Sequence, residues 1–292
     1  MLKQQGYTLI ELIIALALGL IIIAAAVLLL LTGMRSNAMQ QGVSDLQDDA
    51  NFGLNYITQD VRLANLKTIT AKMDDQLLMG GVVLSIHNIP TKFNALSPTL
   101  LSTGGSGLSN VEQHSDQLVI QYRPMATGGF DCQGRRIDDT TYTIIQRYFL
   151  RQDTTKTAGE EQPLSLACDA GRYNESDNAI LDYGDSGEII MKRVDQFHVL
   201  LSVSTDTDQR RYISIDNYLA LGQNKPRILG VYLGALTRSA QNVGKDKAIE
   251  QSNNFAVLDQ DVVVKGNSNP KGYIRRVVTQ EVAFRNALGE RE

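Results

Sequence analysis

The chain has 292 residues, a formal net charge of −4, and 43% hydrophobic and 21% charged residues. This length suffices for one large domain or two modest ones, and the composition lies within the range of globular proteins. A mildly acidic chain gives no electrostatic reason for its whole surface to bind nucleic acid, so we do not expect a protein of that class.

The first expected element is a membrane-spanning helix. Residues 12–31 hold no charged side chain, and at about 1.5 Å per residue they would span about 30 Å, the thickness of a bilayer core. The apolar region of a cleaved secretory signal is shorter and ends in small residues, so we expect a retained span. Lys3 favours a cytoplasmic amino terminus. A carboxylate such as Glu11 near the end of a membrane span costs free energy, so its presence needs a physical reason.

The helix is expected to continue beyond the membrane. The pattern predicts one helix of about 55–60 residues, whose first half lies in lipid and whose second half packs one apolar face on a globular domain. Gly33, Gly42 and Gly53 are expected bend points, because glycine weakens a helix. The apolar residues that recur at spacings of three and four are Val43, Leu46, Ala50, Leu54, Ile57, Val61 and Ala64.

After Asn65 the apolar period falls from about 3.6 to about 2 residues, which predicts β-strands. Residues 151–163 are expected to form a solvated loop, and residues 102–110 and 265–272 are rich in turn formers. No βαβ rhythm is present, so the pattern favours an α+β fold with antiparallel β-sheet packed on the second half of the helix. Strands are expected near residues 82–86, 118–122, 142–150, part of 189–204, 229–233, 255–264 and 278–284.

The chain has two cysteines, Cys132 and Cys168, and neither has the spacing of a zinc ligand. If this part of the protein lies outside the cytoplasm, a single disulfide is the natural interpretation. It would close a loop of about 35 residues and stabilise the fold by about 3–4 kcal/mol. Two unrelated buried thiols are the alternative.

Other polar patterns do not indicate catalysis or metal binding. The sequence GDSG at residues 184–187 surrounds the nucleophile in chymotrypsin-like proteases, but Glu188 follows it here, so a polar turn is the preferred interpretation. The histidines occur singly, the acidic clusters lack a full set of calcium ligands, and dispersed arginine pairs do not predict DNA binding. These residues are His87, His114 and His198, then Asp138-Asp139, Asp182/Asp185/Glu188 and Asp206/Asp208, then Arg135-Arg136, Arg210-Arg211 and Arg275-Arg276.

Residues 6–12, GYTLIEL, resemble the type IV prepilin (class III) signal, in which a short basic leader and a glycine precede an aromatic residue and the apolar helix. The resemblance implies that a prepilin peptidase cuts after Gly6 and methylates the new amino terminus on Tyr7, where many members have Phe. It also implies that Glu11, one helical turn from that terminus, pairs with the amine of a neighbouring subunit. A carboxylate that snorkels to the cytoplasmic interface is the alternative.

Three stretches of the body, together with the chain length, are similar to the PilW group of minor pilins. They are SDQLVIQYRP (residues 115–124), DCQG (residues 131–134) and IRRVVTQEVAFRN (residues 274–286). The resemblance implies a type IV pilin-like fold with four parts. These are a prepilin leader (1–6), a transmembrane half of the helix (7–32), an amphipathic half (33–66) and a periplasmic β-rich domain (67–292).

The expected function is that of a minor pilin in a tip or priming complex that initiates assembly of a type IV pilus, without an enzymatic step or a cofactor. The resemblance implies storage in the inner membrane of a Gram-negative bacterium and later incorporation in the fibre. The implied partners are other minor pilins, the major pilin, a tip adhesin, the prepilin peptidase and the inner-membrane assembly platform, with no nucleic acid. A J-type pseudopilin of a type II secretion system, and a membrane-anchored periplasmic binding module or hydrolase, remain alternatives.

Overall fold

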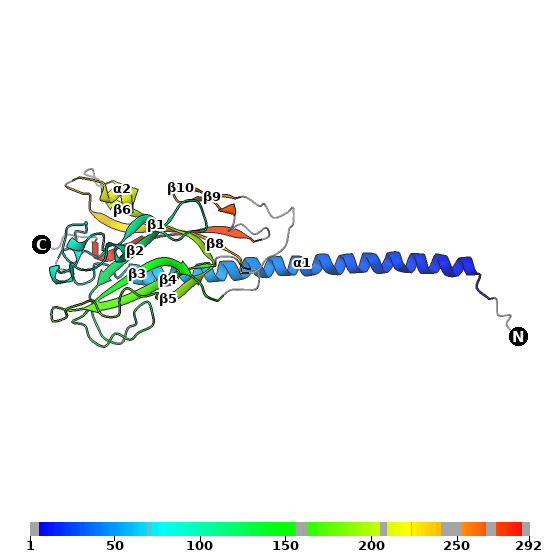
Figure 1. The fold of residues 1–292 in the computed structure, drawn as a ribbon, viewed down its shortest axis with the longest axis horizontal. Helices are drawn as coiled ribbons and strands as arrows, with labels where there is room; N and C mark the ends of the chain where they lie inside the picture. The colour runs from blue at the N-terminus through cyan, green and yellow to red at the C-terminus, as the bar shows by residue number, and fades with distance from the viewer. Residues whose placement is uncertain are drawn as a thin grey trace.

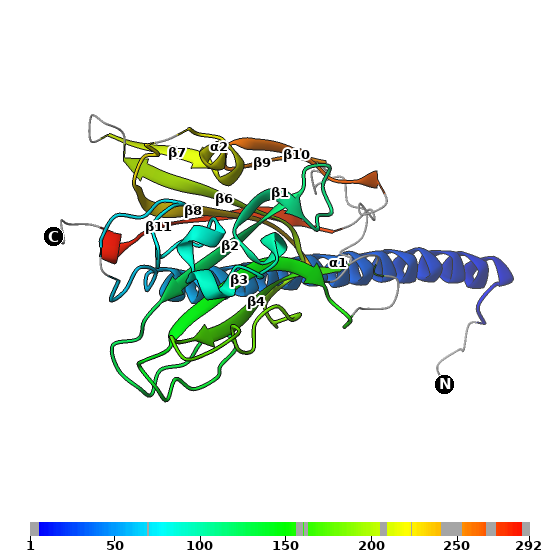
Figure 2. The same cartoon turned by 60° about the vertical axis from the view of Figure 1, so that its left-hand side comes forward.

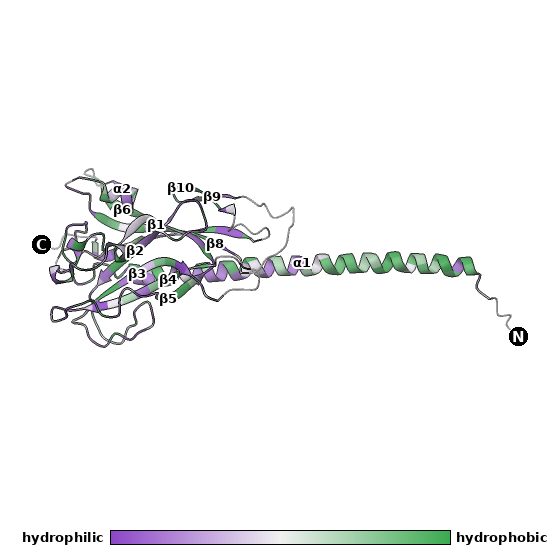
Figure 3. Ribbon diagram, viewed as in Figure 1, coloured by the Kyte–Doolittle hydropathy of each residue, from purple (hydrophilic) through white to green (hydrophobic). Residues whose placement is uncertain are grey.

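One long helix, α1 (Leu9–Val61), organises the molecule (Figure 1). A computed structural model describes residues 6–68, 70–155, 160, 163–204, 209–222, 224–240, 253–266 and 273–287. The first half of α1 projects as a stalk, and the strands gather around its second half, as Figure 2 also shows. In Figure 3 the stalk is almost entirely hydrophobic, whereas polar and apolar residues alternate along the packed half. The expected single helix is confirmed, with 53 residues.

The helix begins at a capping box made by Thr8 and Glu11. Thr8 Oγ1 accepts a hydrogen bond from the Glu11 backbone N–H at 3.3 Å, and Glu11 Oε2 accepts one from the Thr8 backbone N–H at 2.8 Å. These bonds satisfy two donors that a helix start otherwise leaves without partners. Further along, an 18-residue window of α1 has a mean hydropathy of 3.2 and no buried residue, so α1 is long and apolar enough to cross a membrane.

The second half of α1 packs through the stripe that the spacing predicts. Gly42 and Gly53, expected as bend points, lie buried on this same face of a continuous helix. A Cβ atom on Gly53 would lie 2.8 Å from the Cβ atom of Met191 in β5 (Glu188–Lys192), so Gly53 serves close packing and not bending. The other buried residues of the face are Leu46, Ala50, Leu54, Ile57, Thr58 and Val61.

Within the described residues the strands form three antiparallel sheets. A five-stranded sheet has the order β1 (Thr103–Gly107), β2 (Ser115–Tyr122), β3 (Thr143–Gln152), β4 (Leu164–Tyr173) and β5. A four-stranded sheet has the order β11 (Arg275–Ala283), β8 (Ile228–Arg238), β6 (Val194–Ser204) and β7 (Arg210–Ser214). The third is the hairpin of β9 (Asn254–Val257) and β10 (Gln260–Val263). The short helices are η1 (Ile86–Asn88), η2 (Thr91–Phe93), η3 (Pro98–Leu100), α2 (Ile215–Leu219) and η5 (Arg285–Ala287).

The main core lies where α1 meets both large sheets. Leu54 and Ile57 of α1 share one cluster with Leu118 and Ile120 of β2 and with residues of β6 and β8. A second cluster, around Tyr173, covers the opposite face of β2 and β3. Because both of its faces are covered, β2 is buried along its whole length.

The structure corrects three expectations about the body. Residues 82–86 were expected as a strand but form a single bridge, Val82 to Ile120, because Ser85 then caps η1. Residues 103–107 form β1 and not a turn, since the glycines let this strand approach α2: a Cβ atom on Gly104 would lie 2.7 Å from Asp216 Cγ. β4, β7 and α2 were not expected.

The third correction concerns the loop at residues 151–163. Asp153 and Glu160 were expected in a solvated loop, but both are buried. Part of that loop, residues 156–159 and 161–162, lies outside the described residues, as do Asp206, Asp208 and residues 267–272.

We predict that Gly53→Val destabilises the globular part by about 1–3 kcal/mol, because the new side chain meets Met191 in a filled contact. Thermal unfolding of the full chain in detergent, followed by circular dichroism, measures this. Gly33→Val is the matched control, since a Cβ atom there has no neighbour within 4 Å. Equal unfolding temperatures for the two variants would contradict the packing role.

Candidate functional site

The exposed half of α1 is the most unusual surface of the molecule. Its large apolar side chains from Leu9 to Leu31 are all exposed, and only Glu11 interrupts them with a charge. An apolar surface of this length requires lipid or a protein partner. The Glu11 carboxylate also accepts a bond from the Thr8 hydroxyl at 2.9 Å, so in the described chain it binds its own helix start.

The residues before this helix are open to approach. Tyr7 is 93% exposed, and Gly6 is exposed with no atom within 4 Å of a Cβ atom built on it. Both have irregular backbone outside α1. A processing enzyme therefore meets no steric obstacle at this peptide bond from the described residues.

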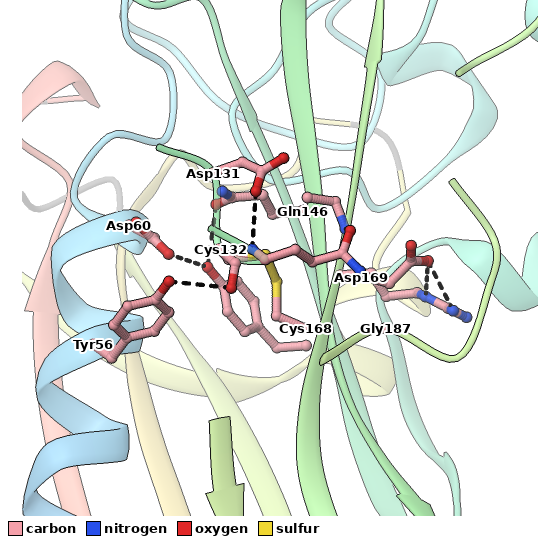
Figure 4. The surroundings of a disulfide bond; sticks show 12 residues. Tyr56, Asp60, Asp131, Cys132, Gln146, Cys168, Asp169 and Gly187 are labelled. Carbon is pink, nitrogen blue, oxygen red and sulfur yellow. Dashed lines mark hydrogen bonds and ion pairs between the residues drawn. A yellow bond between two sulfur atoms is a disulfide. The ribbon is translucent and has the colours of Figure 1, made fainter. Parts of the chain in front are cut away.

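A disulfide joins Cys132 to Cys168, with Cα atoms 6.1 Å apart (Figure 4). Cys168 lies within β4, and Cys132 lies in the connection between β2 and β3. The Tyr56 hydroxyl donates a hydrogen bond to the Cys132 carbonyl oxygen at 3.1 Å, so this connection is also tied to α1. Asp131 accepts bonds from the backbone N–H groups of Gln133 and Arg135, both at 2.9 Å, which shapes the turn around Cys132.

Beside the disulfide, α1 carries a carboxyl group that is mostly hidden from water. Asp60 accepts a hydrogen bond from the Tyr148 hydroxyl at 3.1 Å, and the same hydroxyl lies 3.1 Å from Gln146 Oε1. Burial raises the pKa of Asp60 to about 6; the Tyr148 bond opposes this rise and the Asp131 charge adds to it. A hydroxyl has one hydrogen and cannot donate to both acceptors at once, so a protonated Asp60 completes the network by donating to Tyr148.

A chain of buried charges joins the ends of several strands. Arg193 Nη1 lies 2.7 Å from Asp153, and Arg193 Nε lies 2.6 Å from Glu160. Arg238 bridges Glu160 and Asp195 at 2.9 and 3.3 Å. Arg275 Nε closes the chain at 2.8 Å from Asp195. Removal of one member of such a set leaves a buried charge without compensation, so the network fixes β3, β6, β8 and β11 relative to one another.

The sequence suggested that His198 stands alone, but the structure gives it two acidic partners. Its Nδ1 lies 2.6 Å from Asp116 in β2, and its Nε2 lies 2.8 Å from Asp259 in the turn between β9 and β10. Burial lowers the pKa of His198, but the two carboxylates outweigh it and the net shift is upward. The triplet fastens the β9–β10 hairpin to the core; no group of three acidic, histidine or cysteine residues in the described ranges is arranged to hold a metal ion.

Residues 184–187 form the polar turn that the sequence favoured. The Gly187 N–H donates to Asp185 at 2.7 Å, and the Gly184 N–H donates to Asp169 at 2.9 Å. Gly184 and Gly187 have positive φ values of 101° and 61°, respectively. This backbone conformation explains the glycine pattern without catalysis.

Two family models match separate parts of the chain. Residues 1–27 match the prokaryotic N-terminal methylation motif, and residues 147–286 match the family described as type IV pilus-assembly protein W. The first covers the residues before α1 and most of the exposed helix, and the second runs from β3 to η5. The chain belongs to the PilW-type minor pilins.

No curated protein matches this pilin. Among solved structures it is similar to a type IV-like pilin from Thermus thermophilus, with 12% sequence identity and a TM-score of 0.42. That match covers 83% of this chain and 98% of the other. A similarity of this strength assigns no residue and no role.

As a PilW-type minor pilin, the protein is a structural subunit of a type IV pilus and not an enzyme. It associates with other pilus components, and its apolar helix serves first as a membrane anchor and then within the fibre. The sequence did not reveal the ion network of this pilin. The signal that could have found it was the pair Arg193 and Asp195 inside an apolar strand run, since charges there require buried partners.

We predict that Asp60→Asn stabilises the protein by about 1–3 kcal/mol at pH 7–8, because it removes a carboxylate that burial disfavours. The folded pKa lies above the unfolded value near 3.9, so the stability that neutral Asp60 contributes is complete below about pH 4 and is lost as the pH rises through about 6. The difference between variant and parent should therefore vanish near pH 4.

Urea unfolding of the full chain between pH 4 and 8 measures this difference. Asp48→Asn is the control, since Asp48 is exposed on the same helix. A constant difference across the range would rule out titration of Asp60.

Proposed function

We propose that this minor pilin is cut after Gly6, methylated on Tyr7, and built into the fibre through Glu11, as part of a tip or priming complex that starts pilus assembly. On this proposal residues 1–6 are the leader, 7–32 the transmembrane half of the helix, 33–66 the amphipathic half, and 67–292 a periplasmic domain. The protein resides in the inner membrane of a Gram-negative bacterium until assembly.

The observation that carries the proposal is the position of Glu11 at the start of α1. Cleavage after Gly6 would leave a new amine on Tyr7, the residue before the helix cap at Thr8. Glu11 would then lie one helical turn from a positive charge on its own chain or on a neighbour. A carboxylate in lipid is costly unless paired, so a neighbouring amine in register relieves a penalty that the lone subunit carries.

The size of the globular part supports a place at the end of the fibre. In the part of the chain that the structure describes, eleven strands in three sheets form the globular part, which packs on one face of the second half of α1. A bulky head is accommodated more easily at a fibre end than among stacked subunits. The proposed partners are other minor pilins, the major pilin, a tip adhesin, the prepilin peptidase and the inner-membrane assembly platform. A J-type pseudopilin would share the helix, and recovery of the protein from sheared pili separates the two functions.

We predict that Gly6→Val blocks cleavage and leaves a chain about 0.7 kDa heavier than the mature protein, because a branched side chain replaces the residue before the cut. Intact-mass spectrometry of the protein from the membrane fraction measures this. Gly19→Val, also in open surroundings, should be processed normally. A normal mature mass for Gly6→Val would refute the assigned site.

We predict that Glu11→Ala and Glu11→Gln both insert in the membrane but fall at least about tenfold in sheared pili, because each removes the charge that pairs with an amine. Quantitative immunoblots of membrane and pilus fractions measure this. Gln can replace Glu in a capping box, so the Gln variant separates charge pairing from helix capping.

Thr8→Ala is the converse control for Glu11. It removes the cap hydroxyl and keeps the carboxylate, so it should reduce recovery in pili far less. Normal recovery of Glu11→Gln would show that capping, and not charge, is the role of Glu11.

A further inference from the structure

A cavity of about 290 Å³ is lined in part by residues that directly follow α1. The carboxyl-terminal end of α1 lies at the end of the molecule opposite the exposed stalk (Figure 1). The turn after α1 supplies Lys67 and Thr68, and the segment before η1 and η2 supplies Leu78, Met79 and Pro90. The floor comes from the end of β2, the start of β3 and the end of β4. The volume is near the lower end for ligand pockets, about 300–1,000 Å³, so it fits a small group and not a large cofactor.

The floor of this distal cavity is held in place by buried hydrogen bonds. The Tyr173 hydroxyl donates to Gln121 Oε1 at 2.6 Å, and the Gln121 amide donates to the carbonyl oxygens of Gly80 and Asn88, both at 2.8 Å. The Phe93 ring packs edge-on against Tyr173 with centroids 5.1 Å apart. A ligand would therefore enter a preformed site, which lowers the entropy that binding costs.

Two cations line the distal cavity without a side-chain partner among the described residues. Lys67 and Arg123 make no side-chain hydrogen bond or ion pair with the described residues, and Arg123 Nε is buried without an acceptor. Burial raises the pKa of the Tyr173 hydroxyl in the floor, and the Thr143 hydrogen bond and the Arg123 charge oppose that rise.

The backbone around the distal cavity is also unusual. Lys67 and Met79 have φ values of 58° and 64°, a left-handed conformation that residues other than glycine adopt rarely. Both residues line the cavity, from segments that come together only in the fold. Such conformations gather at binding sites, where the surrounding structure maintains them. Leu78, which also lines the cavity, is 56% exposed, so an apolar side chain is accessible there together with the two cations.

We propose that the distal cavity binds the carboxyl terminus of a partner polypeptide, with Arg123 and Lys67 on the carboxylate and Leu78, Met79 and Pro90 around an apolar terminal side chain. A guanidinium and an ammonium match a carboxylate, and one terminal residue suits the volume. The assignment to a polypeptide rests on the proposed function, since the end opposite the stalk would face the next subunit. Glu175, exposed at the rim, opposes an anion and should weaken binding.

Calorimetric titration of the full chain in detergent micelles tests this with N-acetyl-L-phenylalanine as the probe. The neutral N-acetyl-L-phenylalaninamide should bind at least about tenfold more weakly, because it lacks the charge that Arg123 and Lys67 pair with. Arg123→Gln should weaken binding of the acid about tenfold and Lys67→Gln about threefold, while Glu175→Gln strengthens it about twofold.

Arg62→Gln is the matched control, because Arg62 is an exposed arginine after α1 that lies outside the cavity lining. Since Lys67 is exposed, its variant should fold normally even if Arg123→Gln does not. Equal binding of acid and amide, no binding of either, or equal losses for Arg62→Gln and Arg123→Gln would overturn the proposal. Phenylacetate that binds as tightly as the acetylated residue would overturn the chain-end assignment.

The proposal for the distal cavity and the proposal for Glu11 in assembly can be refuted independently. If Glu11 variants are lost from pili as predicted but the acid does not bind, the cavity proposal alone falls. If the acid binds but Glu11 variants assemble normally, the carboxylate site stands and its partner lies outside the fibre, which overturns the assignment to a neighbouring subunit.

Discussion

The contact between one face of α1 and both large sheets is the interaction on which the rest of the structure depends. Leu54, Ile57 and Val61 reach the main core, and each fully buried side chain of this kind contributes about 1.5–3 kcal/mol. Because the same helix continues without a break into the exposed stalk, the position of the globular part is fixed relative to the stalk. In a subunit built this way, packing of the stalk would also determine the position of the globular part.

Helix and amino terminus were predictable because their signals are local. A stripe at spacings of three and four needs only neighbouring residues, and the GYTLIEL signature is contiguous. β4 was missed because Ser165, Ala167 and Gly171 lack the β-branched side chains that mark a strand, and its stability comes from β3 and β5 on either side. The disulfide followed from there being two cysteines, but the network from Arg193 to Arg275 joins residues distant in sequence that only the fold brings together.

The buried ion network and the disulfide stabilise different parts of this fold. The disulfide binds the β2–β3 connection to β4, and Tyr56 ties that connection to α1. The ion network instead joins β3 to β6, β8 and β11, which belong to the other large sheet. Buried ion pairs contribute little net stability compared with apolar residues, but breaking one is costly. Their effect here is to specify one arrangement of the two sheets, which a membrane-anchored subunit needs before its head can meet partners.

The capping box gives Glu11 a role before and after the proposed cleavage. In the described chain its carboxylate is satisfied by the N–H and hydroxyl of Thr8, so its cost near lipid is lower than that of a lone acid. Those bonds are charge-assisted on one side only, whereas a bond to an ammonium is assisted on both. On the proposed function, an amine from a neighbouring subunit would displace Thr8 without leaving the carboxylate unpaired at any stage. The helix start holds Glu11 in one orientation, so this proposed exchange would stabilise the assembled subunit only when the two helices are in register.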